Sequence, residues 1–230
     1  MRTPDWVTLL RDPSETAARC TEERELASLA RSSLASLVLG AAVLGGVLGS
    51  FRGGAQIPLA AIKLPLVLLV TLAVSAPAFH ALANTLGVRW SFRTVVALAL
   101  AASARAALVL AALAPPLWLA MDCGLGYHGC ALAAVAVVAL GGLVGASLVV
   151  RALGATASGV ASGLACACVF LAVLAQASWI GRPYLVRPRT EDMVIVRAAE
   201  GTFLESIGTS SRSVRGLYDA PEAPLPEHER

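Results

Sequence analysis

The sequence predicts an all-α fold, a polytopic transmembrane helical bundle of five spans with short polar ends. Between Ser33 and Gly181, Asp122 is the only acidic residue, and the rest of this region is almost continuously apolar. Hydrophobic residues make up 57% of the chain and charged residues 14%, whereas soluble domains average about 25% charged residues. Because a soluble domain needs a charged surface, lipid is the solvent that explains this composition.

Residues 1–32 form a polar N-terminal segment with five arginines and six acidic residues. The pattern predicts one helix from Ser14 to Arg31, because Ser14 follows Pro13 in the manner of an N-cap. Apolar sequence begins only at Leu34. We therefore expect residues 1–32 to face water beside the bundle.

The transmembrane bundle is predicted to occupy residues 33–181. It contains five apolar segments, each with about 18 residues or more, which is enough to cross a bilayer. The second and third segments approach about 28 residues and are expected to tilt or kink. Both contain prolines, which favour kinks. The predicted spans are residues 34–51, 57–84, 92–120, 131–150 and 160–180.

The arginines in the short loops predict the orientation of the bundle. Arg89 and Arg93 lie between the second and third segments, and Arg151 follows the fourth, whereas the loop 121–130 has no Lys or Arg. Because cytoplasmic loops are enriched in these residues, the N-terminus is predicted to be cytoplasmic. Five spans then place the C-terminal tail outside. An even number, with one re-entrant segment, would place it inside, and this alternative stays open.

Residues 182–230 form a polar tail with seven arginines and eight acidic residues. Thr202 and Glu205 match a capping box, which predicts a short helix through Phe203 and Ile207. From Gly208 onward Ser, Gly, Pro and Glu dominate, and this composition favours disorder.

Two cations lie inside apolar segments, Lys63 in the second and Arg105 near the middle of the third. Antiparallel spans would place them at similar depth, where an unpaired charge is costly and marks a polar interior. One hypothesis is that both line a cavity that binds an anion, such as a lipid phosphate or a carboxylate. The alternative is that Lys63 extends toward the interface and Arg105 bonds to backbone carbonyls freed by nearby prolines.

The loop after the third segment contains Asp122, Cys123, His128 and Cys130. In an oxidising compartment, a Cys123–Cys130 disulfide would close this glycine-rich turn. Free thiols are the main alternative. The C-x4-H-x-C spacing matches no strong zinc pattern, so no metal site and no cofactor are predicted.

Small residues recur at the G-x-x-x-G spacing that lets helices approach closely in lipid. They predict tight helix packing, and no recognised catalytic motif accompanies them. We therefore expect no catalytic residues and no enzyme activity. The predicted packing pairs are Gly45 and Gly49, Gly141 and Gly145, and Gly159 and Gly163.

Residues 45–94 contain three features in order: K-L-P-L at the entry to the second span, Pro77 late in it, and Ser-Phe-Arg at the entry to the third. The chain resembles uncharacterised bacterial membrane proteins related to the Yip (Ypt-interacting) superfamily, over roughly residues 34–180 and the E-G-T-F-L-E run in the tail. The resemblance implies five spans, a cytosolic N-terminus and a short tail across the membrane. Eukaryotic members assist vesicle trafficking, but their acidic and tyrosine-rich motifs before the first span are absent here.

These observations predict a non-enzymatic, multi-pass protein that organises lipid or partner proteins in a bacterial inner (plasma) membrane. One lysine beside seventeen arginines, with abundant alanine, indicates a GC-rich bacterial genome. The expected partners are membrane lipids, other membrane proteins or a second copy of the chain. Nucleic acid is not expected, because no dense basic stretch exists. The alternative function is a small transporter or permease for an anionic or lipid-like substrate that uses Lys63 and Arg105.

Overall fold

The computed structural model describes residues 5–85, 87–154, 157–180, 184 and 203–215. Within these residues the secondary structure is entirely helical, which confirms the predicted all-α class. Five helices are long and apolar enough to cross a membrane. These are α3 (Leu26–Ser50), α4 (Gln56–Thr85), α5 (Phe92–Asp122), α6 (Tyr127–Leu153) and α7 (Ala157–Ile180). Three shorter helices flank them: α1 (Asp5–Arg11), α2 (Pro13–Thr21) and α8 (Phe203–Val214).

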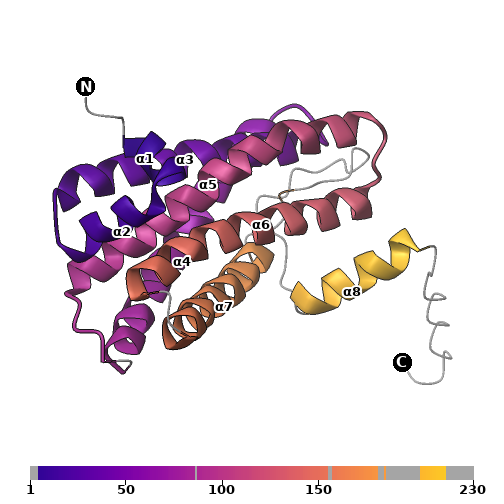
Figure 1. The fold of residues 1–230 in the computed structure, drawn as a ribbon. Helices are drawn as coiled ribbons and strands as arrows, with labels where there is room; N and C mark the ends of the chain where they lie inside the picture. Colours follow the sequence, from indigo (N-terminus) through magenta and orange to yellow (C-terminus); the bar gives the residue numbers. More distant parts are fainter. Residues whose placement is uncertain (1–4, 86, 155–156, 181–183, 185–202, 216–230) are drawn as a thin grey trace, which may run out of the picture.

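The long helices form a bundle around the contact between α3 and α5 (Figure 1). α4 packs against α3, α6 packs against α5, and α7 packs against α6 and α4. The short helices α1 and α2 pack where α5 begins and α6 ends, so we call this the N-terminal end of the bundle. The helix α8 lies beside α6, and His128 in the first turn of α6 contacts Ser210 at 3.3 Å.

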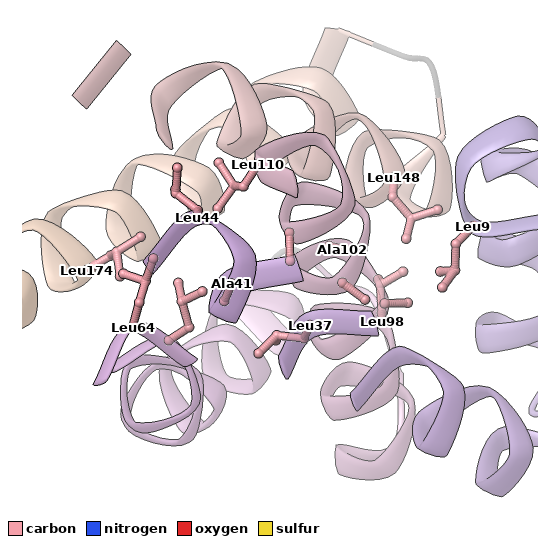
Figure 2. Packing of buried hydrophobic residues seen from close by; sticks show 14 of the residues in the cluster. Leu9, Leu37, Ala41, Leu44, Leu64, Leu98, Ala102, Leu110, Leu148 and Leu174 are labelled. Carbon is pink, nitrogen blue, oxygen red and sulfur yellow. The ribbon is translucent and has the colours of Figure 1, made fainter. Parts of the chain in front are cut away.

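The buried side chains at the centre follow a helical period. Leu37, Ala41 and Leu44 lie one turn apart along α3 and face α5 across the core (Figure 2). This spacing places the three side chains on one face of α3, and that face packs against the other helices. Leu148 of α6 and Leu9 of α1 belong to the same cluster. The N-terminal helices are therefore part of the folded core and not a separate appendage.

The N-terminal segment differs from its prediction. The helix α2 ends at Thr21 and has Asp12 as its N-cap, whose carboxylate accepts a hydrogen bond from the Glu15 amide at 2.9 Å. The predicted single helix from Ser14 to Arg31 is therefore wrong. Its interruption falls where Glu23 and Glu25 adopt positive φ angles of 55° and 52°, a conformation that no helix continues through.

The first spanning helix begins at Leu26, eight positions before the first apolar residue of the predicted span. The third spanning helix, α5, has 31 residues. At about 1.5 Å per residue it is longer than a hydrocarbon core of about 30 Å. α1 and α2 pack against the first part of this helix, and helices longer than the hydrocarbon commonly tilt.

The C-terminal helix α8 begins at Phe203, as the capping-box pattern predicted, whereas Thr202 lies outside the described residues. It continues through Gly208 to Val214, so the prediction of disorder from Gly208 onward is wrong for this stretch. Because α8 contacts the start of α6 and the N-terminal helices contact its end, the two lie at opposite ends of the bundle. An odd number of spans gives this arrangement.

Candidate functional site

An apolar pocket of about 90 Å³ lies between α4, α5, α6 and α7 and is partly open to the surface of the bundle. Large side chains line it from all four helices. They include Leu72 and Phe79 of α4, Leu98 of α5, Val149 of α6 and Phe170 of α7.

The pocket exists because the facing surfaces of α5, α6 and α7 are built from small residues. Alanine and glycine have too little side-chain volume to fill the space that the four helices enclose, and empty space of this kind loses packing contacts. The small lining residues include Ala99, Ala102, Ala106, Gly142, Gly145 and Ala167.

The pocket lining offers almost no polar chemistry. Among the lining residues that the structure describes, only Ser103, Cys166 and Trp90 carry a polar side-chain atom, and none is charged. A site of this composition does not compensate the desolvation of an ion. It suits a hydrocarbon group, which gains dispersion contacts with the walls.

Arg105 binds backbone carbonyls, but not those freed by a proline. Its Nη1 atom donates hydrogen bonds to the carbonyl oxygens of Leu9 at 2.6 Å and Leu10 at 3.1 Å, both in the last turn of α1. Carbonyls at a helix C-terminus have no partner within the helix, and a cation there also interacts favourably with the helix dipole. Arg105 therefore caps α1 and attaches the N-terminal segment to the bundle.

Lys63 lies in different surroundings. Its Nζ atom is 5.5 Å from the centre of the Tyr184 ring, and the Gln56 side-chain amide donates to the Tyr184 carbonyl at 3.4 Å. A lysine over an aromatic face makes a cation–π contact. Neither Lys63 nor Arg105 lines the apolar pocket. The structure thus does not bring them into the common anion-binding cavity that the sequence suggested, because their partners belong to different elements.

The two loop cysteines are free thiols. Cys130 is buried, and its Sγ atom donates to the carbonyl oxygen of Leu125 at 3.1 Å, whereas Cys123 is exposed just after α5. The predicted disulfide is therefore not formed, because the thiol of Cys130 is turned toward the backbone of its own loop. Among the described residues no group of three potential metal ligands occurs.

Five of the six predicted packing glycines lie where another helix approaches. A Cβ atom on Gly49 would lie 2.5 Å from the Gln56 carbonyl oxygen, and one on Gly145 would lie 2.6 Å from that of Ala102. Gly45 faces the backbone of Ala60, Gly141 faces Leu110, and Gly163 faces Val150. Gly159 instead faces the carbonyls of Leu153 and Gly154 at the turn before α7.

A second attachment of the N-terminal segment has no sequence motif. The Glu23 carboxylate accepts hydrogen bonds from Ser91 Oγ at 2.6 Å and Thr94 Oγ1 at 2.7 Å, at the start of α5. Ser91 is the N-cap of α5 and accepts from the Thr94 amide at 3.2 Å. Hydrogen bonds from Ser91 and then Thr94 lower the pKa of Glu23 below its ordinary value of 4.5. Ser91 is recognisable as a cap, but its partner 68 residues away is not.

No protein-family model, curated protein or solved structure matches this chain. The resemblance to the Yip superfamily therefore stays a prediction from short motifs.

Proposed function

We propose that this multi-pass membrane protein binds lipid and organises it, or partner proteins, in a bacterial inner membrane without catalysing a reaction. The observation that carries the proposal is the apolar pocket between α4, α5, α6 and α7. Its occupant is an acyl chain of a surrounding lipid. None of the described lining residues is charged, which supports a binding role over acid–base chemistry.

The energetics favour an occupied pocket. Leaving about 90 Å³ of apolar space empty costs about 2 kcal/mol, by the cost per volume measured for cavities in protein cores. An acyl chain that fills this space restores the lost dispersion contacts and needs no polar partner. It is also the most abundant apolar group in a bilayer. α6 and α7 also expose large apolar side chains such as Leu143 and Leu164, as expected for helices in contact with lipid.

We propose further that the N-terminal end faces the cytoplasm. Arg89 and Arg93 lie at this end beside the start of α5, and Arg151 lies in the last turn of α6. The loop between α5 and α6 at the other end has neither Lys nor Arg, which agrees with the bias of cytoplasmic loops. Reporter fusions after Trp90 and after Tyr127 test this: activity typical of the cytoplasm is expected only for the first. The opposite pattern would invert the proposed orientation.

Occupancy of the pocket is testable through Trp90, one of its lining residues. In a variant with the other three tryptophans replaced by Phe, phospholipid brominated on its chains should quench Trp90 fluorescence in nanodiscs. Ala167→Phe fills the pocket from α7 and is expected to reduce this quenching. Ala165→Phe adds the same ring to an exposed position on the same helix, so it is the matched control. Equal quenching in both variants would reject the acyl-chain site.

A further inference from the structure

A pair of arginines lies at the N-terminal end of the bundle. Arg151, in the last turn of α6, lies close enough to Arg105 of α5 for the two charges to repel. Arg105 Nη1 is bonded to the carbonyls of Leu9 and Leu10, but its Nε is buried without a hydrogen-bond partner. Arg151 is exposed and has no hydrogen bond or ion pair with the described residues. The pair therefore leaves guanidinium donors, the Arg105 Nε and the Arg151 group, without a partner among the described residues.

A groove of about 320 Å³ adjoins Arg151, between α2 and the end of α6. α2 contributes Ser14, Ala17, Ala18 and Thr21 to its walls, and α6 contributes Arg151 and Ala152. This groove is separate from the apolar pocket, which α6 lines with Val149 and Leu153 instead. It combines the Arg151 guanidinium and the Ser14 hydroxyl with walls of alanine, a composition that suits an anion better than the apolar pocket does.

The acidic residues near the groove are engaged elsewhere. The Asp12 carboxylate caps α2, and Glu23 accepts from Ser91 and Thr94. The other four form ion pairs with Arg19 or Arg24 of the N-terminal segment. These pairs are Asp5–Arg19 at 2.9 Å, Glu25–Arg19 at 3.7 Å, Glu15–Arg24 at 3.7 Å and Glu22–Arg24 at 2.9 Å. No described carboxylate of this segment is thus committed to Arg105 or Arg151.

We propose that this groove binds the phosphate of an anionic phospholipid headgroup. The Arg151 guanidinium donates to the phosphate oxygens, and Arg105 adds positive potential while it holds α1 in place. The position is suitable, because the groove lies against the last turn of the spanning helix α6, at an end of the bundle, where headgroups lie. The site is independent of the acyl-chain pocket on the other side of α6. It would give the protein a preference for anionic lipid that the apolar pocket alone does not supply.

The test measures lipid preference in nanodiscs that contain phosphatidylglycerol and phosphatidylcholine, by native mass spectrometry of the retained lipids. Arg151→Gln is expected to lower the preference for phosphatidylglycerol about tenfold, as for the loss of a hydrogen bond between charged groups. Arg89→Gln removes an exposed arginine at the same end but outside the groove, and it should leave the preference unchanged. Ala167→Phe should also leave it unchanged, because that substitution alters only the apolar pocket.

A second arm distinguishes a lipid headgroup from free phosphate. Inorganic phosphate is added to the protein in phosphatidylcholine nanodiscs, and the thermal midpoint is compared with that in chloride at equal ionic strength. A preference for phosphatidylglycerol that depends on Arg151 supports the proposal. If inorganic phosphate raised the thermal midpoint through Arg151 and the protein showed no preference for phosphatidylglycerol, the groove would bind a soluble anion and the proposal would be overturned. An Arg151→Gln protein that keeps its lipid preference, or an equal loss in Arg89→Gln, would also overturn it.

Discussion

Arg105 in the middle of α5 donates a 2.6 Å hydrogen bond to the carbonyl oxygen of Leu9, 96 residues earlier in the chain. The bond gives the Leu9 carbonyl, at the end of α1, a hydrogen-bond donor. It also gives the Arg105 guanidinium, which lies in a largely apolar helix, an acceptor. A hydrogen bond between a charged donor and a carbonyl stabilises the folded protein by about 1.5–3 kcal/mol. The N-terminal segment should therefore detach more readily when this side chain is shortened or neutralised.

Replacing Arg105 by Gln is expected to expose Cys20 to alkylation. Cys20 lies in α2, is fully buried in the core cluster, and burial raises the pKa of its thiol to about 11. A loss of about 1.5–3 kcal/mol in docking corresponds to an increase of about tenfold or more in the alkylation rate at pH 7. The measurement is mass spectrometry of maleimide-treated protein over time, in a variant that has Cys20 as its only cysteine.

Arg31→Gln is the matched control for this substitution. Arg31 is exposed, and among the described residues it donates only to the Ala27 carbonyl of its own helix. Cys20 should remain protected in that variant. Equal rates for the two variants would mean that Arg105 does not hold the N-terminal segment.

The attachment through Glu23 should depend on pH. Because its pKa is lowered in the folded protein, its stabilising contribution is present above the ordinary value of 4.5 and is lost as the pH falls through the folded value. Glu23→Gln should therefore melt below wild type near neutral pH, and the difference should shrink in acid. Thermal melts between about pH 3 and pH 7 measure this. A difference that stays constant over this range would show that the charge of Glu23 contributes nothing.

The close approach of α3 and α4 predicts opposite outcomes for two glycines of α3. In Gly49→Ala the new Cβ would meet the Gln56 carbonyl at 2.5 Å, whereas in Gly46→Ala the nearest atom would be 3.9 Å away. Overpacking typically costs about 1–3 kcal/mol. Unfolding in mixed micelles should show this loss for Gly49→Ala and little change for Gly46→Ala. Similar stabilities would contradict the observed helix separation.

The loop thiols should differ in reactivity. Cys123 is exposed, whereas Cys130 is buried and donates to the Leu125 carbonyl. Brief treatment with a maleimide should label Cys123 and spare Cys130, and reduction beforehand should not change the labelling. Peptide mass spectrometry of the labelled wild type follows each thiol separately. If reduction were needed before the wild type could be labelled at Cys123, the two would be joined in a disulfide.

The spanning helices were predictable because their signal is local. A run of apolar residues without carboxylates, such as the one in α6, forms a helix in lipid whatever its neighbours are. The start of α3 was missed because residues 26–33, which mix polar and apolar side chains, continue the same helix ahead of the apolar run. The break at Glu23 and Glu25 was not predictable, because glutamate has no preference for positive φ and glycine is the usual signal.

The candidate site was harder to predict than the fold. The sequence singled out Lys63 and Arg105 as unusual charges, but it could not show which backbone carbonyls or rings surround them. Depth along a span sets only one coordinate, and the direction in which a side chain points around the helix sets the rest. The apolar pocket has no motif at all, because alanine and glycine are common throughout the chain and only their facing arrangement creates the space.

The link between Leu9 and Arg105 has a consequence for biosynthesis. Leu9 leaves the ribosome 96 residues before its partner, which at about 5–20 residues per second is a delay of roughly 5–20 s. During this time the first two helices have been made, but α5 and α6, the surfaces on which they dock, have not been inserted. Helices α1 and α2 are therefore made well before α5 and α6, but they reach their final position only after those helices are in place.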